Sequence, residues 1–395
     1  MELPGDRFDV IIIGGGIMGS CTAYEAAKRG RRALLLEQFD FLHHRGSSHG
    51  ESRTIRATYP KSYYPPLVLE SYSLWSKAES EAGYRVLTKT RHLVVGPAAD
   101  CSLQAVIANS AARVIDRTEV DDLFSGSFRL PDGWIGISEA GGVIKPTKAV
   151  AMFQTLALKR GAVLKDHTEV KEIKKDEAGG VLITTANGHM FRGAKCVVTV
   201  GSWTRKLVNT VTGLVLPIQP LHTCVCYWKI KDGYEKDLTL EKGFPTFSSY
   251  SEPHIYGTPS AEFPGLIKIA MDSGYPCDPD LRDWTSSSGV LVDAVRSWIK
   301  EFLPGRVEAE RPVMTQACMY SMTPDGDFVI DFLGGEFGTD VVVGAGFSGH
   351  GFKMGPAVGR ILADLAIDGE AKGVDLRWFR MARFEEDPKG NAKGV

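Results

Sequence analysis

Residues 8–19 read FDVIIIGGGIMG, and this stretch decides the fold class. An apolar run of strand length leads directly into glycines that match G-x-G-x-x-G at Gly14, Gly16 and Gly19. Such glycines allow a tight turn, close approach of the backbone to a pyrophosphate, and close packing of the next helix on the strand. The stretch therefore predicts a strand that ends in a phosphate-binding turn.

The residues after the glycines complete a βαβ unit. Ile17 and Met18 open a predicted helix, and a second strand at 32–36 ends in Glu37, 21 residues after Gly16. An acid at this distance can bind ribose hydroxyls. A glycine turn in an ordinary βαβ unit is the alternative, but the order of strand, glycines, helix, strand and acid favours dinucleotide binding.

A second glycine-rich run, GAGFSGHGFK at 344–353, lies near the other end of the chain. It follows a Val-rich strand, and we expect an amphipathic helix to start after Gly351. The glycines let the backbone approach a flat ligand, and the helix start directs positive partial charge toward it. His350 and Lys353 add side-chain donors. We therefore expect the two distant runs to hold one cofactor together.

The composition agrees with a soluble enzyme of two domains. The chain has 395 residues and a net charge of −2, with a pI of about 6.5, so it gives no electrostatic case for binding nucleic acid or an anionic membrane. No apolar run approaches the roughly 20 residues of a membrane helix. The first strand begins too early for a signal peptide, and the final AKGV is not an SKL-type address.

The seven cysteines are scattered and odd in number, which indicates reduced thiols rather than disulfides. Cys224 and Cys226 would share one face of a strand, but no further Cys or His stands at ligand spacing, so we predict no metal site.

Strand formers and turns alternate with helical segments along the chain. We predict an α/β (α+β) protein in which a discontinuous, Rossmann-like nucleotide domain carries an inserted, strand-rich substrate domain. The nucleotide domain comprises 1–87, 142–216 and 327–395, and the substrate domain 88–141 and 217–326. We expect helices near 145–165 and 289–303, and a mobile polar tail after Phe384.

Four blocks of sequence resemble the monomeric sarcosine oxidase and pipecolate oxidase family of flavin amine oxidases. They are the N-terminal fingerprint, GSSHGESRTIR at 46–56, CMYS at 318–321, and GFSGHGFK at 346–353. The resemblance runs from about Asp9 to about Phe384. It implies an FAD-binding domain, a small amine substrate, O₂ as acceptor and a monomer. It also leaves open whether the protein is peroxisomal or cytoplasmic.

The resemblance assigns cofactor contacts to the last three blocks. From the local sequence alone, Cys318 would be a small core side chain. The resemblance instead makes it the point where FAD is attached through a thioether, which fixes the flavin ring and tunes its redox potential. The other residues that the resemblance places at the cofactor are Ser47, His49, Arg53, Gly346, Ser348, Gly349, His350, Gly351 and Lys353.

The resemblance also implies how substrate and oxygen are bound. Arg56 and Lys353 would clamp the substrate carboxylate, although arginines in such a loop are usually solvated. Lys268 would lie over the flavin and activate dioxygen. In the strand LIKIAMD at 266–272, alternation places Lys268 opposite Ile267 and Ile269, and a solvent-facing lysine is the alternative.

Three further residues complete the predicted pocket. Tyr256 and Tyr320 match aromatic positions of the family, and either could equally be a packing tyrosine. Asp272 departs from the family, which has a histidine there, and could neutralise Lys268 or attract a second cationic group on the substrate.

The predicted reaction is oxidation of a secondary amino acid. Hydride leaves the carbon next to nitrogen for flavin N5, O₂ then gives H₂O₂, and the imine hydrolyses. No side-chain base is required if the amine enters neutral. A dehydrogenase with another electron acceptor and a non-catalytic flavoprotein scaffold are the alternatives.

Overall fold

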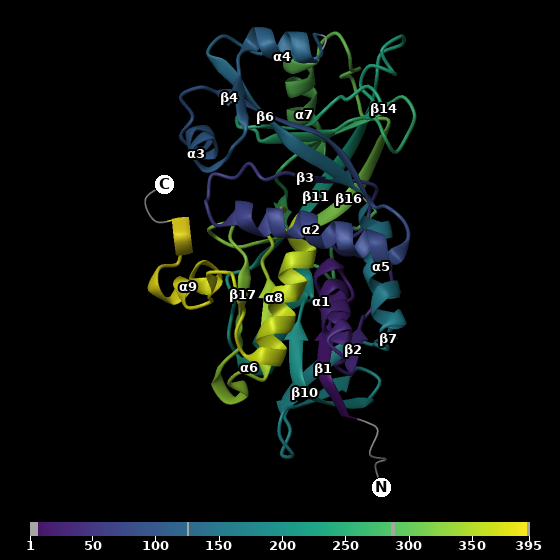
Figure 1. The fold of residues 1–395 in the computed structure, drawn as a ribbon, viewed down its shortest axis with the longest axis vertical. Helices are drawn as coiled ribbons and strands as arrows, with labels where there is room; N and C mark the ends of the chain where they lie inside the picture. Colours follow the sequence, from purple (N-terminus) through teal and green to yellow (C-terminus); the bar gives the residue numbers. More distant parts are fainter. Residues whose placement is uncertain (1–6, 125, 286–288, 393–395) are drawn as a thin grey trace.

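Two sheets form the framework of the protein. The computed structural model describes residues 7–124, 126–285 and 289–392, and Figure 1 shows one sheet in the lower half and the other in the upper half. Helix α2 (Tyr64–Ala82) lies across the level at which the two halves meet. The predicted α/β fold class is confirmed.

The lower sheet has eight strands with a parallel centre. Its order is β17-β18-β10-β1-β2-β7, and β8 and β9 extend it from β10. The strands are β1 (Arg7–Ile13), β2 (Ala33–Leu36), β7 (Val163–Lys165), β8 (Val170–Lys175), β9 (Val181–Thr185), β10 (Met190–Val198), β17 (Val329–Phe332) and β18 (Val341–Ala345). β1 pairs in parallel with β2 and β10, and β10 pairs in parallel with β18, so the two glycine runs follow parallel strands that are separated by β10 alone. Carboxyl ends of such strands meet at one edge of the sheet, where ligands bind.

Three helices cover this sheet beside the glycine runs: α1 (Ile17–Lys28), α5 (Pro146–Lys159) and α8 (Gly355–Asp368). α1 packs against both α5 and α8. A Cβ at Gly359 of α8 would overlap Cys21 of α1, so this close packing requires glycine. Gly19 serves the strand side, since a Cβ there would overlap the carbonyl oxygen of Gly14.

The upper sheet has ten strands and is mostly antiparallel. Its order is β15-β11-β14-β13-β12-β4-β6-β3, with β16 on β11 and β5 on β6. The strands are β3 (Arg53–Ile55), β4 (Leu87–Pro97), β5 (Arg113–Ile115), β6 (Trp134–Ile144), β11 (Gln219–Lys229), β12 (Thr246–Ser249), β13 (Ile255–Thr258), β14 (Leu266–Met271), β15 (Tyr275–Pro276) and β16 (Met314–Met322). Helices α3 (Cys101–Asn109), α4 (Arg117–Leu123) and α7 (Gly289–Phe302) belong to this half.

The two sheets follow the predicted domain boundaries only in part. The strands of 88–141 and 217–326 all lie in the upper sheet, but β3, from the 1–87 segment, also pairs there with β6. The division therefore stays a prediction, with the crossing from one half to the other near Arg53.

Two local expectations were wrong. The helix expected after Gly351 is preceded by a 3₁₀ turn, η3 (Phe352–Met354), and α8 begins only at Gly355. The tail after Phe384 is packed rather than mobile through Ala392: Gly390 is buried, and the Asn391 amide donates to Asp327 at 2.8 Å. Buried Asp325 and Asp327 provide acceptors for this segment, and no hydrophobic pattern could reveal them.

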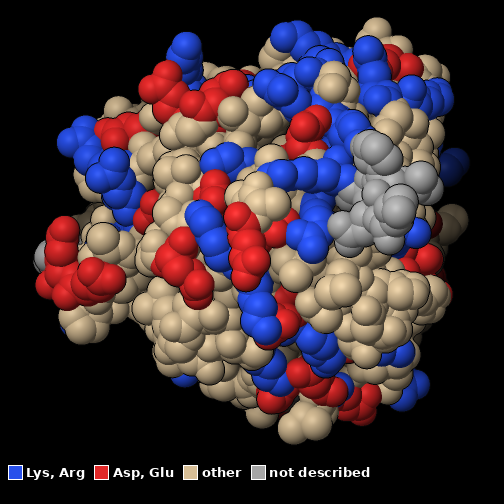
Figure 2. Space-filling model, turned by 90° about the horizontal axis from the view of Figure 1, so that it is seen from below, with Lys and Arg blue, Asp and Glu red and all other residues tan. Residues whose placement is uncertain are grey.

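Surface charge is mixed and the helices are short. On the face seen in Figure 2, acidic and basic side chains lie side by side, in keeping with the net charge of −2. None of the helices in the described part of the chain is long and apolar enough to cross a membrane.

Candidate active site

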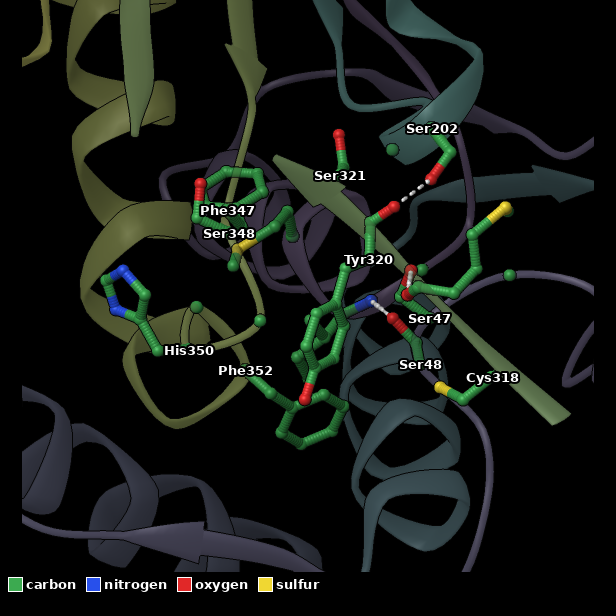
Figure 3. A pocket seen from close by; sticks show the side chains of 18 of the residues that line it. Ser47, Ser48, Ser202, Cys318, Tyr320, Ser321, Phe347, Ser348, His350 and Phe352 are labelled. Atoms are coloured by element: carbon green, nitrogen blue, oxygen red, sulfur yellow. Dashed lines mark hydrogen bonds between the residues drawn. The ribbon is translucent and has the colours of Figure 1, made fainter. Parts of the chain in front are cut away.

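A cavity of about 720 Å³ extends from the glycine turn of the lower sheet into the upper sheet. Figure 3 shows Tyr320 in its centre, between Cys318 and the loop that carries Ser348 and His350. Nearly every residue predicted for the site lines it: Gly14, Gly16, Ile17, Met18, Glu37, Ser47, Arg53, Arg56, Tyr256, Lys268, Asp272, Cys318, Tyr320, Ser348, Gly349, His350, Gly351 and Lys353. Gly19, His49 and Gly346 do not.

The dinucleotide end of the cavity is formed by the N-terminal motif. Gly14 adopts φ +102°, a conformation that favours glycine, and a Cβ there would clash with the main chain of Thr199. The buried Glu37 carboxylate accepts hydrogen bonds from the amides of Gly15 (2.8 Å) and Phe39 (3.0 Å). The predicted turn and acid are therefore brought together at the edge of the sheet.

The loop after β2 is fixed against the centre of the site. Ser48 Oγ accepts from the amide of Ile17 at 3.1 Å, at the start of α1, and Ser47 Oγ donates to the carbonyl of Met319 at 2.6 Å. This loop thereby joins the glycine turn to β16, which carries Cys318 and Tyr320.

Cys318 is a buried thiol in a positively charged setting. Arg53 Nη2 lies 3.8 Å from its Sγ. Burial alone would raise the pKa of the Cys318 thiol, but neighbouring His49 and Arg53 outweigh burial and lower it to about 6. A thiolate is the reactive form of cysteine, so Cys318 is the chain's best-placed nucleophile in the cavity.

Lys268 is not the solvent-facing lysine that strand alternation alone allowed. Its residue is 2 % exposed, while Ile267 and Ile269 point into the hydrophobic core on the other face of β14. Its Nζ donates to Ser52 O (2.9 Å) and lies 3.2 Å from Ser52 Oγ. Burial, followed by the charge of Arg53, lowers the pKa of Lys268 to about 8.

Arg56 and Lys353 meet at Tyr59. The guanidinium carbon of Arg56 lies 4.6 Å from the centre of the Tyr59 ring, and Lys353 Nζ donates to the Tyr59 hydroxyl at 3.0 Å. Lys353 also donates to the carbonyl of His350 at 2.8 Å. Burial and the charge of Arg56 hold the pKa of Lys353 well below its usual range. Two basic groups thus share one buried corner of the cavity.

His350 supports this corner rather than offering a donor to a ligand. Burial and the charge of Lys353 lower its pKa to about 3, so the ring is neutral near pH 7. Its Nε2 lies 2.9 Å from the carbonyl of Gly326 and must carry the proton, which leaves Nδ1, at 3.3 Å, to accept from the Tyr59 hydroxyl. The predicted donor is therefore already used within the protein.

Sequence reasoning missed Tyr59 and the carboxylate that orders the loop beside it. The only signal for Tyr59 was its place three residues after Arg56. Glu139, on β6, accepts from the amides of Ala57 (3.1 Å) and Thr58 (2.8 Å) and so fixes the loop between Arg56 and Tyr59. Because Glu139 is distant in sequence, only the pairing of β6 with β3 brings it here.

The remaining predicted residues surround the space in front of this corner. Tyr256 on β13 and Tyr320 on β16 both line the cavity, and Lys268 Nζ lies 5.7 Å from the centre of the Tyr256 ring. Burial, with the nearby charge of Asp272, raises the pKa of both tyrosines. Gly349 allows Tyr320 to approach, since a Cβ there would lie 2.8 Å from its ring.

His49, and the pair formed by Cys224 and Cys226, are the remaining side chains that were considered from the sequence as ligands of a cofactor or a metal ion. Both ring nitrogens of His49 are buried, and the ring lies beside Cys318, whose pKa it helps to lower. Cys224 and Cys226 lie with their sulfurs 3.6 Å apart. Within the described ranges, no cluster of three or more His, Cys, Asp or Glu residues could hold a metal ion.

The cavity residues fit the FAD that the resemblance implies. A bare glycine turn lies beside a buried acid at one end, as the phosphates and ribose of a dinucleotide require. In the middle lies the Cys318 thiol, whose pKa is lowered by His49 and Arg53.

The comparisons with known proteins agree with this geometry. The family model "FAD dependent oxidoreductase" matches residues 9–365. A probable sarcosine oxidase of Arabidopsis thaliana is 58% identical, covering 100% of this chain and 97% of its own length. The human peroxisomal sarcosine oxidase is 35% identical, over 97% of this chain and 98% of its own.

A solved structure shows the same fold. NikD, described as an unusual amino acid oxidase essential for nikkomycin biosynthesis, superposes with a TM-score of 0.79 at 26% identity, covering 94% of this chain and 96% of that one. The match of the family model and the identity to the sarcosine oxidases both extend over nearly the whole chain. The protein therefore belongs to the family of FAD-dependent oxidoreductases, among its sarcosine oxidase relatives.

Proposed function

We propose that this protein is an oxidase of secondary amino acids that uses O₂ as its acceptor. One observation carries the proposal: the Arg56–Tyr59–Lys353 corner, suited to a carboxylate, opens into the same cavity as Cys318 and Lys268. The names of the sarcosine oxidase relatives support the substrate class. When bound, FAD would accept a hydride from the carbon next to the amine and pass the electrons to O₂.

The proposed role of Arg56 and Lys353 is to bind and orient the substrate carboxylate. Charge-assisted hydrogen bonds are strong in a partly dry site, and they fix which carbon faces the cofactor. Since burial and Arg56 hold the pKa of Lys353 low, the anion should restore its charged form.

Cys318 is our proposed point of covalent attachment. Its lowered pKa makes the thiolate available near pH 7, and Arg53 at 3.8 Å stabilises that charge. Lys268 would place a positive charge where negative charge develops on O₂. A protonated Lys268 requires a pH below about 8, which makes the reaction with oxygen pH-dependent.

The test is anaerobic mixing of the yellow protein with L-pipecolate, sarcosine, L-proline and larger secondary amines, followed by air. We expect one of these amines to bleach the protein and air to restore the colour with formation of H₂O₂. Bleaching without recovery would identify a dehydrogenase and contradict the role of Lys268. A protein that no amine bleaches would leave the scaffold alternative.

Two further features remain proposals. We infer a monomer, which sedimentation of the purified protein would test. We also infer a peroxisomal or cytoplasmic location; the human relative is named as peroxisomal, and fractionation of cells that express the native chain would distinguish the two.

A further inference from the structure

Six carboxylates line the cavity, and five of them have donors of their own. Glu37 accepts main-chain amides, Glu169 meets Lys171, Asp280 meets Lys206, Asp325 meets Arg383, and Asp327 meets Lys61. The sixth, Asp272, has no ion pair with any residue that the structure describes. Among the described residues, its side chain meets the hydroxyl of Tyr320.

The backbone places Asp272 where the lining of the cavity meets solvent. It directly follows β14, on the face that carries Lys268 into the cavity, and its amide donates to His254 O at 2.8 Å. The residue is exposed, so its carboxylate faces water while it remains part of the lining. The backbone thus holds in place a carboxylate that has no ion pair with any described residue and is open to a ligand.

Asp272 is also close enough to act on the carboxylate corner. Its charge raises the pKa of Lys353 against the opposing effects of burial and Arg56. With burial, it also contributes to the raised pKa of Tyr59 and Tyr250. A carboxylate in this place repels a substrate anion, and a positive charge on the substrate offsets that repulsion.

We propose that Asp272 is a specificity-determining residue that receives a cationic nitrogen of the substrate, so that the site selects zwitterionic over purely anionic ligands. The inference rests on the proposed function and names the charge pattern of its substrate. The cation has two sources. It is either the reacting amine itself, which enters protonated and releases its proton to water before oxidation, or a second basic group on a longer side chain.

The first test uses ligands that cannot be oxidised. N-methylpyridinium-2-carboxylate and 2-methylbenzoate have nearly the same shape, but only the first carries a positive nitrogen. Their dissociation constants follow from the change in the visible spectrum of the oxidised holoenzyme. We expect the wild type to prefer the cationic probe, and Asp272→Asn to reduce this preference about tenfold, a modest factor because the carboxylate is exposed.

A second pair of ligands distinguishes the source of the cation. Nα-methyl-L-lysine and Nα-methyl-L-norleucine differ by the side-chain ammonium, and anaerobic reduction of the cofactor gives their apparent affinities. Asp272 receives the side-chain cation if the wild type prefers the lysine derivative and Asp272→Asn removes that preference. In that case the ratio of dissociation constants within the first pair stays unchanged. Loss of preference within the first pair assigns the reacting amine.

Asp280→Asn is the matched control, since Asp280 lines the same cavity but meets Lys206 and Trp203. It should leave both ratios unchanged. A general folding defect in Asp272→Asn would weaken both members of a pair, whereas the inference requires 2-methylbenzoate to bind equally well or more tightly. The same ratios in Asp272→Asn and wild type, for both pairs, would overturn it.

The outcomes also separate this inference from the proposed function. If the probes bind with the expected ratios but no secondary amine reduces the cofactor, the proposed function fails while the role of Asp272 in selecting cations stands. If secondary amines reduce the cofactor and Asp272→Asn changes neither ratio, the proposed function stands and the role of Asp272 fails.

Discussion

Lys268 should make the reaction with oxygen depend on pH. Its pKa is lowered from 10.5 to about 8 by burial and by the charge of Arg53. The shift corresponds to about 3 kcal/mol against the charged form. Ser52 offsets part of this cost, because its carbonyl and hydroxyl oxygens lie 2.9 and 3.2 Å from the Lys268 ammonium.

The expected size of the effect follows from the pKa. Lys268 is about 90 % protonated at pH 7 and about 10 % protonated at pH 9 if its pKa is 8. The rate constant for reoxidation should therefore fall about tenfold over this range, because the charge is lost as pH rises through the pKa. Added negative charge in the cavity would move the midpoint upward, never downward.

The assay is rapid mixing of substrate-reduced protein with buffered O₂ from pH 6.5 to pH 10. Lys268→Met should lower the rate constant about a hundredfold, remove the pH dependence and leave reduction by substrate nearly unchanged. Lys206→Met is the control, since Lys206 lines the cavity but pairs with Asp278 and Asp280. A wild-type rate constant that stays flat or rises to pH 10, or a Lys268→Met protein with the same decline, would refute the reasoning.

Three other changes test the rest of the site. Cys318→Ser should release the yellow cofactor on denaturation, whereas Cys21→Ser and Cys101→Ser should retain it; colour that stays with denatured Cys318→Ser protein contradicts the attachment. Arg56→Gln should raise KM for amino acids by about 1–3 kcal/mol in free-energy terms, and steady-state kinetics with an unchanged KM would exclude the carboxylate clamp. Tyr59→Phe removes the hydroxyl that Lys353 and His350 share while keeping the ring under Arg56, so KM should rise about five- to tenfold with little change in kcat. A kcat that falls as steeply as kcat/KM would instead place Tyr59 in the chemical step.

Local patterns were enough to predict the dinucleotide end of the site. Gly14, Gly16 and Glu37 come together through backbone conformation and sequence spacing, which a short βαβ unit fixes by itself. The same holds for the alternation of β14, which correctly separated Lys268 from Ile267.

The carboxylate corner needed the tertiary structure. This corner joins two halves of the molecule: Arg56 and Tyr59 follow β3 of the upper sheet, and Lys353 lies in η3, which comes after β18 of the lower sheet. No periodicity in the sequence predicts that these segments meet. The hydrogen bond that His350 Nε2 donates to the carbonyl of Gly326 likewise depends on a distant turn, so the sequence did not reveal it.

The amino-acid sequence by itself determined the fold class, the cofactor-binding turn and, through its resemblance to a family, the residues to inspect. Only the tertiary structure decided how these residues ionise and which of them form ion pairs. Burial and Arg53 lower the pKa of Lys268, whereas His49 and Arg53 lower the pKa of Cys318 against the effect of burial. Asp272 differs from the other carboxylates of the cavity because it has no ion pair among the described residues. The physical reason is that backbone turns depend on neighbours in sequence. Charge and solvation depend on neighbours in space.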